Sequence, residues 1–317
     1  MRLPPAACRL LTADCRLLTV LLLSCIARPA HAALTEGPRL AVIYNTILNA
    51  QFDRADALLA QTCPPAPASA CHVLDVVSLW WLIQINPESP DRQQQDQRFL
   101  ERAAAATKAA DAWTKREPQR AEAWFYLASS YAPLVQWQVL QHDRLAAARN
   151  GSRIRSALER TLQLDPTIVD AHFGVGLYEY YADVASSAAK VLRWLLFLPG
   201  GDRVKGLQDM LQARNGGEVL RGEADYQLQI VYLWYEHEPG RAIDLLKSLD
   251  ARYPANPLFL QRIAEAYDTY LHDTRASAAA WKALVDRARA NRVYDAAGTA
   301  ARAETKRRAV VARLRPF

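Results

Sequence analysis

Apolar residues recur every three or four positions along most of this chain, the spacing that places them on one face of an α-helix. In residues 40–50, for example, Leu40, Ile43, Tyr44 and Ile47 fall on one stripe. The alternation of apolar and polar residues that indicates β-strands is nearly absent, and glycine is scarce, at 12 of 317 residues. The pattern therefore predicts an all-α fold.

Residues 223–288 carry the most regular pattern, which we interpret as two helix–turn–helix units that repeat every 34 residues. The first unit has apolar or small residues at fixed places of this period: Tyr226, Ile230, Leu233, Ala242, Leu246, Leu249 and Pro254. The second unit has these at the same places: Leu260, Ala264, Tyr267, Ala276, Ala280, Ala283 and Ala288. Two helices cross closely only where the side chain is small, so we expect Ala242 and Ala276 to be buried at equivalent crossings.

This pattern resembles the tetratricopeptide repeat (TPR) superfamily. The resemblance implies an α-solenoid whose first helices line a concave binding groove. Residues 121–166 look like a further unit that exceeds the repeat length by about fourteen residues. We place the excess between Pro133 and Ser152, and expect Asn150-Gly151 to end one helix before Ser152 caps the next.

The sequence divides into four segments. Residues 1–32 are predicted to be a signal peptide, and 33–120 an N-terminal helical region with a degenerate repeat, including helices at 71–85 and 92–116. Residues 121–290 hold the TPR-like repeats with an insertion at 182–201. Residues 291–317 form a basic capping helix.

The first 32 residues have the parts of a secretory leader. A positively charged start precedes an apolar run, Leu17 to Ile26, too short to span a bilayer, and Ala30-His31-Ala32 is a cleavage site. We therefore expect a periplasmic or secreted protein that begins at Ala33. The alternative is a lipoprotein, because the residues before Cys25 approximate a lipobox.

The net charge and the cysteines bear on possible partners and on covalent cross-links. The leader accounts for three of the six net positive charges, so the remaining surface gives no indication of nucleic-acid binding. Only Cys63 and Cys71 follow the leader, and a proline-rich loop joins them. In an exported chain this pair predicts a disulfide.

No arrangement of residues indicates catalysis, a metal or a cofactor. The histidines have neither partners at metal-ligand spacing nor a metalloprotease frame, and no nucleophile elbow is present. We therefore predict a protein that is not an enzyme and has no cofactor.

The TPR resemblance assigns the groove residue by residue. The positions it places on the groove face are Phe125, Phe173, Leu177, Tyr180, Tyr181, Gln227, Val231, Trp234, Tyr235 and Gln261. Aromatic anchors of this kind suit recognition of a peptide or partner helix. An equally weighted alternative is that the insertion at 182–201 folds back and buries them.

Two functions are consistent with this sequence. The first is a scaffold of the bacterial envelope that binds a protein or peptide in its groove. The second is a ligand-handling, transporter-associated TPR protein that encloses a small apolar molecule among Phe173, Tyr180, Trp234 and Tyr235. Membrane association would require lipidation or the apolar segment 190–198 lying at an interface.

Overall fold

The structure, a computed structural model, describes residues 34–187, 190 and 199–314. The described residues belong to one compact unit. The predicted leader, with Cys25 as the alternative lipidation site, and the apolar run at 191–198 lie outside the described residues.

All regular structure in these residues is helical, which confirms the all-α prediction. The N-terminal helices are α2 (Gly37–Leu48), α3 (Phe52–Thr62), α4 (Ala68–Ile85), α5 (Arg92–Arg116), α6 (Ala121–Leu140) and α7 (Arg144–Leu164). The later helices are α8 (Ala171–Val184), α10 (Arg203–Gly216), α11 (Arg221–Trp234), α12 (Pro239–Arg252), α13 (Pro257–Thr269), α14 (Thr274–Arg289) and α15 (Ala296–Ala312).

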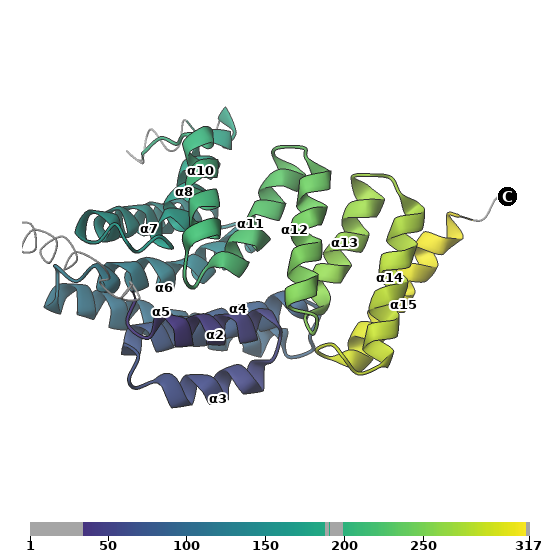
Figure 1. Cartoon of the computed structure of the whole chain (residues 1–317), viewed down its shortest axis with the longest axis horizontal. Helices are drawn as coiled ribbons and strands as arrows, with labels where there is room; N and C mark the ends of the chain where they lie inside the picture. Colours follow the sequence, from purple (N-terminus) through teal and green to yellow (C-terminus); the bar gives the residue numbers. More distant parts are fainter. Residues whose placement is uncertain (1–33, 188–189, 191–198, 315–317) are drawn as a thin grey trace, which may run out of the picture. The chain divides into compact units, whose positions relative to one another are not determined.

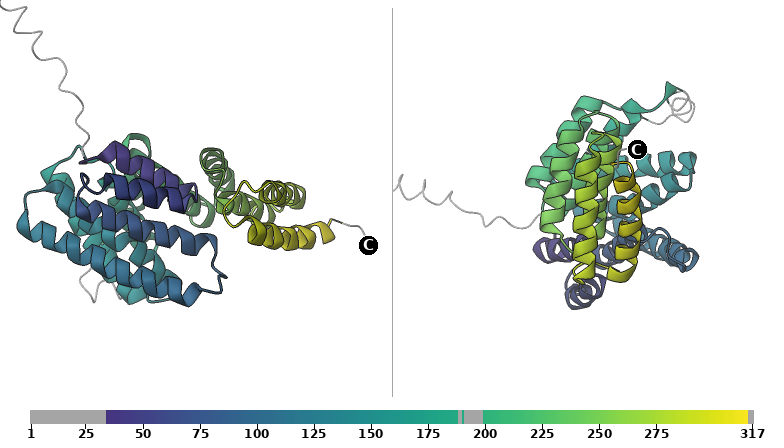
Figure 2. Two further views of the ribbon diagram at one scale, coloured as in Figure 1. Left: turned by 90° about the horizontal axis from the view of Figure 1, so that it is seen from below. Right: turned by 90° about the vertical axis from the view of Figure 1, so that its right-hand side faces the viewer.

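Consecutive helices pack in pairs, and each pair packs on the next, which is the arrangement of an α-solenoid. The pairs are α2–α3, α4–α5, α6–α7, α8–α10, α11–α12 and α13–α14, and α15 lies beside α14 at the C-terminal end (Figures 1 and 2). The helical-repeat architecture is therefore confirmed.

The turns after α11 and α13 show that equivalent residues of the last two pairs are 35 residues apart. Each turn has a histidine with left-handed backbone, His237 at φ 55° and His272 at φ 52°. The next residue then donates its N–H to a helix carbonyl, Glu238 to Tyr232 at 2.8 Å and Asp273 to Tyr267 at 2.9 Å. The predicted period of 34 is thus one residue short for this part of the units.

This spacing corrects one of the two predicted crossings. Ala242 is fully buried as expected, but Ala276 is only half-buried. The fully buried equivalent of Ala242 is Ser277, 35 residues later. The alanines at 276, 278, 279 and 280 allow the pattern to fit either spacing, so composition could not select the register.

We expect Ser277→Leu to destabilise the protein by about 1–3 kcal/mol, because the added atoms overpack a filled contact. Ala276→Leu, one residue away, should change the stability by no more than about 0.5 kcal/mol. Urea denaturation of both variants tests the 35-residue spacing. If Ala276→Leu is the more damaging change, the register described here is wrong.

The long unit at 121–166 divides its extra length between two helices. Helix α6 has 20 residues with Pro133 inside it, and α7 has 21. Asp143 caps the N-terminus of α7, since its side chain accepts the N–H of Ala146 at 3.0 Å, and the helix continues through Asn150 and Gly151. The predicted stop at Asn150-Gly151 is therefore wrong. The Asn150 amide instead donates to Gln138 on α6 at 3.1 Å and holds the two helices together.

Two glycines bring α8 and α10 into backbone contact. A Cβ on Gly176 would lie 2.5 Å from the carbonyl oxygen of Gly206, and one on Gly206 would lie 2.6 Å from that of Gly176. Because neither position has room for a methyl group, only glycine at both allows this approach. Gly176 and Gly206 together therefore set the spacing between α8 and α10.

Helix α4 is the only one of the described helices long and apolar enough to cross a membrane, with a mean hydropathy of 1.4 over 18 residues. It is nevertheless a core helix here. Trp81 has no exposed surface, and its ring lies 4.9 Å from that of Tyr226 on α11 and 5.9 Å from that of Phe259 on α13. The N-terminal region is thereby packed against helices more than 140 residues further along the chain.

Helix α2 contacts the same late helices through polar groups. Tyr253 donates its hydroxyl to Asn45 at 2.6 Å, and Asn256 donates its amide to the carbonyl of Leu48 at 2.8 Å. Figure 1 shows the N-terminal ends of α11 and α13 directed toward α2 and α4. These contacts fix α2 to the connection between α12 and α13.

A carboxyl group is buried between α2 and α11. Glu223 accepts a hydrogen bond from the Tyr44 hydroxyl at 3.1 Å and from the Gln227 amide at 2.9 Å. Burial raises the pKa of Glu223, and the hydrogen bonds from Gln227 and Tyr44 oppose that rise. These donors are uncharged, so the charged form is solvated by dipoles without a cation.

Glu223→Gln is expected to stabilise the protein at neutral pH. Folding raises the pKa of Glu223, so the protonated side chain favours the folded state. This contribution to stability is fully present below the unfolded pKa of about 4.3, and it is lost as pH rises through the folded pKa. A glutamine removes that loss, since its amide can donate to the Tyr44 oxygen. Melting temperatures from pH 4 to 8 should converge with wild type at the acidic end.

The matched control is Glu265→Gln, the same chemical change at a half-buried residue that pairs with Arg262 at 2.8 Å. It should not stabilise the protein at neutral pH. A lower melting temperature for Glu223→Gln at pH 8 would contradict a destabilising carboxylate.

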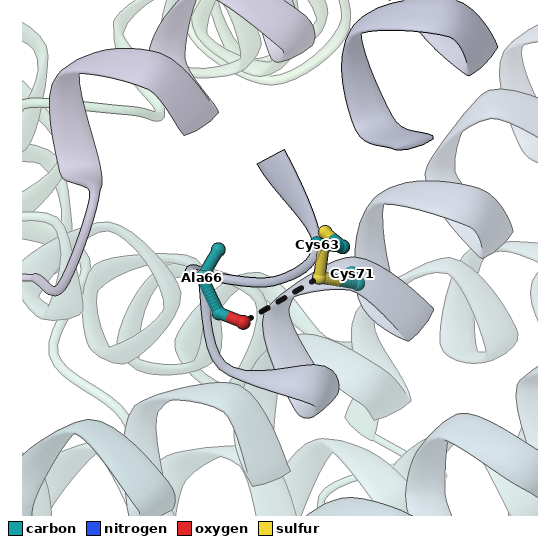
Figure 3. The surroundings of a disulfide bond; sticks show 3 residues. All are labelled: Cys63, Ala66 and Cys71. Atoms are coloured by element: carbon teal, nitrogen blue, oxygen red, sulfur yellow. Dashed lines mark hydrogen bonds between the residues drawn. A yellow bond between two sulfur atoms is a disulfide. The ribbon is translucent and has the colours of Figure 1, made fainter. Parts of the chain in front are cut away.

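The predicted disulfide is present, with Cα atoms of Cys63 and Cys71 6.2 Å apart (Figure 3). It joins the end of α3 to the first turn of α4. In the chain-entropy model, closing so short a loop stabilises the fold by roughly 2–3 kcal/mol. The bond therefore fixes the connection that leads into the core helix.

Candidate partner-binding surface

The structure separates the predicted groove residues into three groups. The buried residues are Phe125, Phe173, Tyr180, Gln227 and Val231. The half-buried residues are Leu177, Tyr181 and Gln261. Trp234 and Tyr235 are exposed, at 54% and 38%. The expected continuous groove surface is therefore not formed by this set, since half of its members have almost no accessible area.

Two of the buried residues lie where the N-terminal helices pack. Phe125 belongs to the core that α2 and α4 share with α6 and α11, and its ring meets that of Tyr126 edge-on at 5.3 Å. Gln227 donates to Glu223 beneath Tyr44. The resemblance to a regular repeat gave no sign that earlier helices would cover these positions, because such contacts do not recur with the repeat.

Phe173, Tyr180 and Val231 are buried for a different reason. They belong to the core formed by α8, α10, α11 and α12, together with Met210 and Leu228. The close approach of α10 to α8 at Gly176 and Gly206 turns this face of α8 into an interior surface. The alternative was that the insertion at 182–201 buries these side chains. Several residues of that insertion lie outside those described. The described helices α8, α10, α11 and α12 are sufficient to explain the burial of Phe173, Tyr180 and Val231.

Three aromatic side chains at the C-terminal ends of α8 and α11 keep exposed area. We call Tyr181, Trp234 and Tyr235 the aromatic ledge. The rings of Tyr181 and Tyr235 meet edge-on at 5.4 Å, and buried Tyr180 meets them at 5.6 and 6.0 Å. Edge-to-face contacts of this kind hold aromatic rings in fixed orientations.

An ion pair holds the residue that follows Tyr235 of the ledge. Arg203, in the first turn of α10, forms two hydrogen bonds to the carboxylate of Glu236, and the Tyr180 hydroxyl donates to the same carboxylate. The hydrogen bonds from Arg203 lower the pKa of Glu236, and burial raises the pKa of Tyr180. Glu236 follows Tyr235 directly, so this contact fixes the end of α11 relative to α8 and α10. No pattern in the sequence indicates this network.

The next repeat places apolar residues at the corresponding turn. Tyr270, 35 residues after Tyr235, is 39% exposed, and its neighbour Leu271 is 43% exposed. In Figure 1 the turns α11–α12 and α13–α14 lie at the same end of their helices. Gln261, in contrast, lies within α13 and donates to Glu265 at 2.9 Å.

Among the residues described, no group of three or more His, Cys, Asp or Glu side chains is placed to hold a metal ion. Two open cavities, of about 260 and 360 Å³, lie between α10, α11 and α12 and between α5, α6 and α7. Neither is lined by Phe173, Tyr180, Trp234 or Tyr235, the residues that would enclose a small apolar molecule.

Comparison with known proteins leaves the family open. No family model matches the chain, and no curated protein matches it. Among solved structures, the crystal structure of MamA protein is similar at 15% sequence identity. That similarity covers 66% of this chain and 93% of the other, with a TM-score of 0.34.

Proposed function

We propose that this protein is a non-catalytic scaffold of the bacterial envelope, exported by its leader, that binds a protein or peptide partner. The observation that supports this most directly is the aromatic ledge. Trp234 exposes more than half of its surface. Its neighbour Tyr235 is held by edge-to-face contacts with Tyr180 and Tyr181 and by the ion pair that Glu236 forms with Arg203. Exposed, rigid aromatic side chains are the typical anchors of protein interfaces.

The ledge replaces the full groove in this proposal. The buried residues Phe125, Phe173, Tyr180, Gln227 and Val231 position helices, whereas Tyr181, Trp234 and Tyr235 present the contact surface. A peptide that adds an apolar side chain to such a ledge would bury area on both partners. It would cost little rotamer freedom at Tyr181 and Tyr235, because their rings already contact each other and Tyr180.

Photo-crosslinking in the producing cell tests the proposal. A photoreactive amino acid replaces Tyr235 in one strain and Val42, an apolar residue of α2 that is 52% exposed, in a control strain. We expect a discrete crosslinked species from position 235, absent at position 42 and lost when Trp234→Ala is added. Equal capture from both positions would exclude the ledge as the binding surface.

A further inference from the structure

The chain enters α2 through contacts with two carboxylates. Leu34 is 1% exposed, and the backbone N–H and hydroxyl of Thr35 donate to the two oxygens of Glu122, each at 2.8 Å. The backbone of Leu34 donates to Glu218. Glu122 lies in the first turn of α6 and Glu218 just before α11, so both elements hold the same short segment.

The surroundings of this segment are mostly acidic. Asp170 is 2% exposed and accepts the backbone N–H groups of Glu218, Val219 and Leu220. Arg120 pairs with Glu122 at 2.9 Å, and Arg221 acts on Asp170 from a distance. Burial, followed by the charge of Asp170, raises the pKa of Glu218, which indicates that its negative charge is incompletely balanced.

A buried hydroxyl lies among these carboxylates without a partner. The Tyr126 side chain is 5% exposed, and its hydroxyl forms no hydrogen bond to any described residue. Tyr126 lies four residues after Glu122 on α6, so the two side chains are on the same face of that helix. Burial first, then the charges of Glu122, Asp170 and Glu218, raise the pKa of Tyr126. Buried hydroxyls are nearly always hydrogen-bonded, so this one can accept a hydrogen bond from a further group.

We propose that Glu122, Glu218 and Tyr126 form a binding site for the α-ammonium group of Ala33, which removal of residues 1–32 would create. This inference rests on the proposed cleavage before Ala33. Only the Cα and carbonyl carbon of Ala33 separate its nitrogen from that of Leu34, a distance below about 4 Å. An ammonium carries a positive charge and three donors, which suit two carboxylates and a hydroxyl.

The proposal gives the cleavage a structural role. Before cleavage the nitrogen of Ala33 belongs to a neutral peptide group with a single donor. After cleavage it becomes a cation beside the residues that hold α2, and the attachment of α2 to α6 and α11 is strengthened. The carboxylates alone could also stabilise the N-terminal end of α2 through its helix dipole, and that role does not require a free amine.

The test uses protein that begins at Ala33, made by cleaving a fusion that leaves no extra residue. NMR titration of the α-amino group should give a pKa about one unit or more above the usual 7.7–8.0. Glu218→Gln should return it toward that range. A Gly-Ser extension before Ala33 should lower the melting temperature of wild type by several degrees, with little effect on Glu218→Gln.

An ordinary α-amino pKa in wild type, or an extension that lowers both melting temperatures equally, overturns the ammonium site. N-terminal sequencing of protein taken from the envelope distinguishes failure of the ammonium site from failure of the proposed cleavage before Ala33. If the chain begins at Ala33 but its amine titrates normally, only the present inference fails. If the chain begins elsewhere, or at a lipid-modified Cys25, the proposed processing fails and the inference with it.

Discussion

Trp81→Ala is expected to destabilise the protein by about 3–5 kcal/mol, the range for removing a buried aromatic side chain. Trp81 has no exposed surface and joins three parts of the chain, because its ring on α4 contacts Tyr226 of α11 and Phe259 of α13. Its removal leaves a cavity where these helices meet. Chemical denaturation followed by far-ultraviolet circular dichroism measures the loss.

The matched control is Trp234→Ala, the same substitution at a 54% exposed residue, which should cost no more than about 0.5 kcal/mol. If the two variants unfold at the same denaturant concentration, Trp81 does not join the N-terminal helices to the later pairs in the manner described.

Trp234→Ala has its large effect on binding instead. We expect the affinity for the physiological partner to fall about thirty-fold or more, since loss of an aromatic anchor typically costs 2 kcal/mol or more. The substitution removes the most exposed ring of the ledge without touching the contact between Arg203 and Glu236. Titration of the partner captured by crosslinking at position 235 provides the dissociation constants.

Val42→Ala serves as the control for this measurement, because it trims an exposed apolar side chain remote in sequence from the ledge. It should bind like wild type. A folded Trp234→Ala protein with unchanged affinity would refute the assignment of the ledge, whatever the partner is.

The sequence was sufficient to predict the helical architecture and the disulfide, because both follow from local signals. Apolar periodicity predicted α5 with its bounds and located α4 to within three residues. Register was harder. The alanine-rich start of α14 fits two spacings equally, and the turn at His272 that selects one of them depends on backbone conformation, which no side-chain pattern reveals.

The candidate surface could be predicted only in part. A repeat register specifies which way a side chain points from its own helix, and it did select Trp234 and Tyr235. It cannot specify what else packs there. Phe125 and Gln227 are covered by helices from a different part of the chain, and Phe173 and Tyr180 by a neighbour that two glycines bring unusually close.

The hydrogen bonds between α2 and the later pairs join residues separated by 179 to 208 positions. A simple array of repeats has mostly local contacts, and its units can form one after another from any starting point. Here the contacts of α2 with Tyr253 and Asn256 are non-local, so they form only once these distant parts of the chain come together. We therefore expect slow, late protection of α2 amides in pulsed hydrogen exchange during refolding, while α14 and α15, whose contacts are local, become protected early.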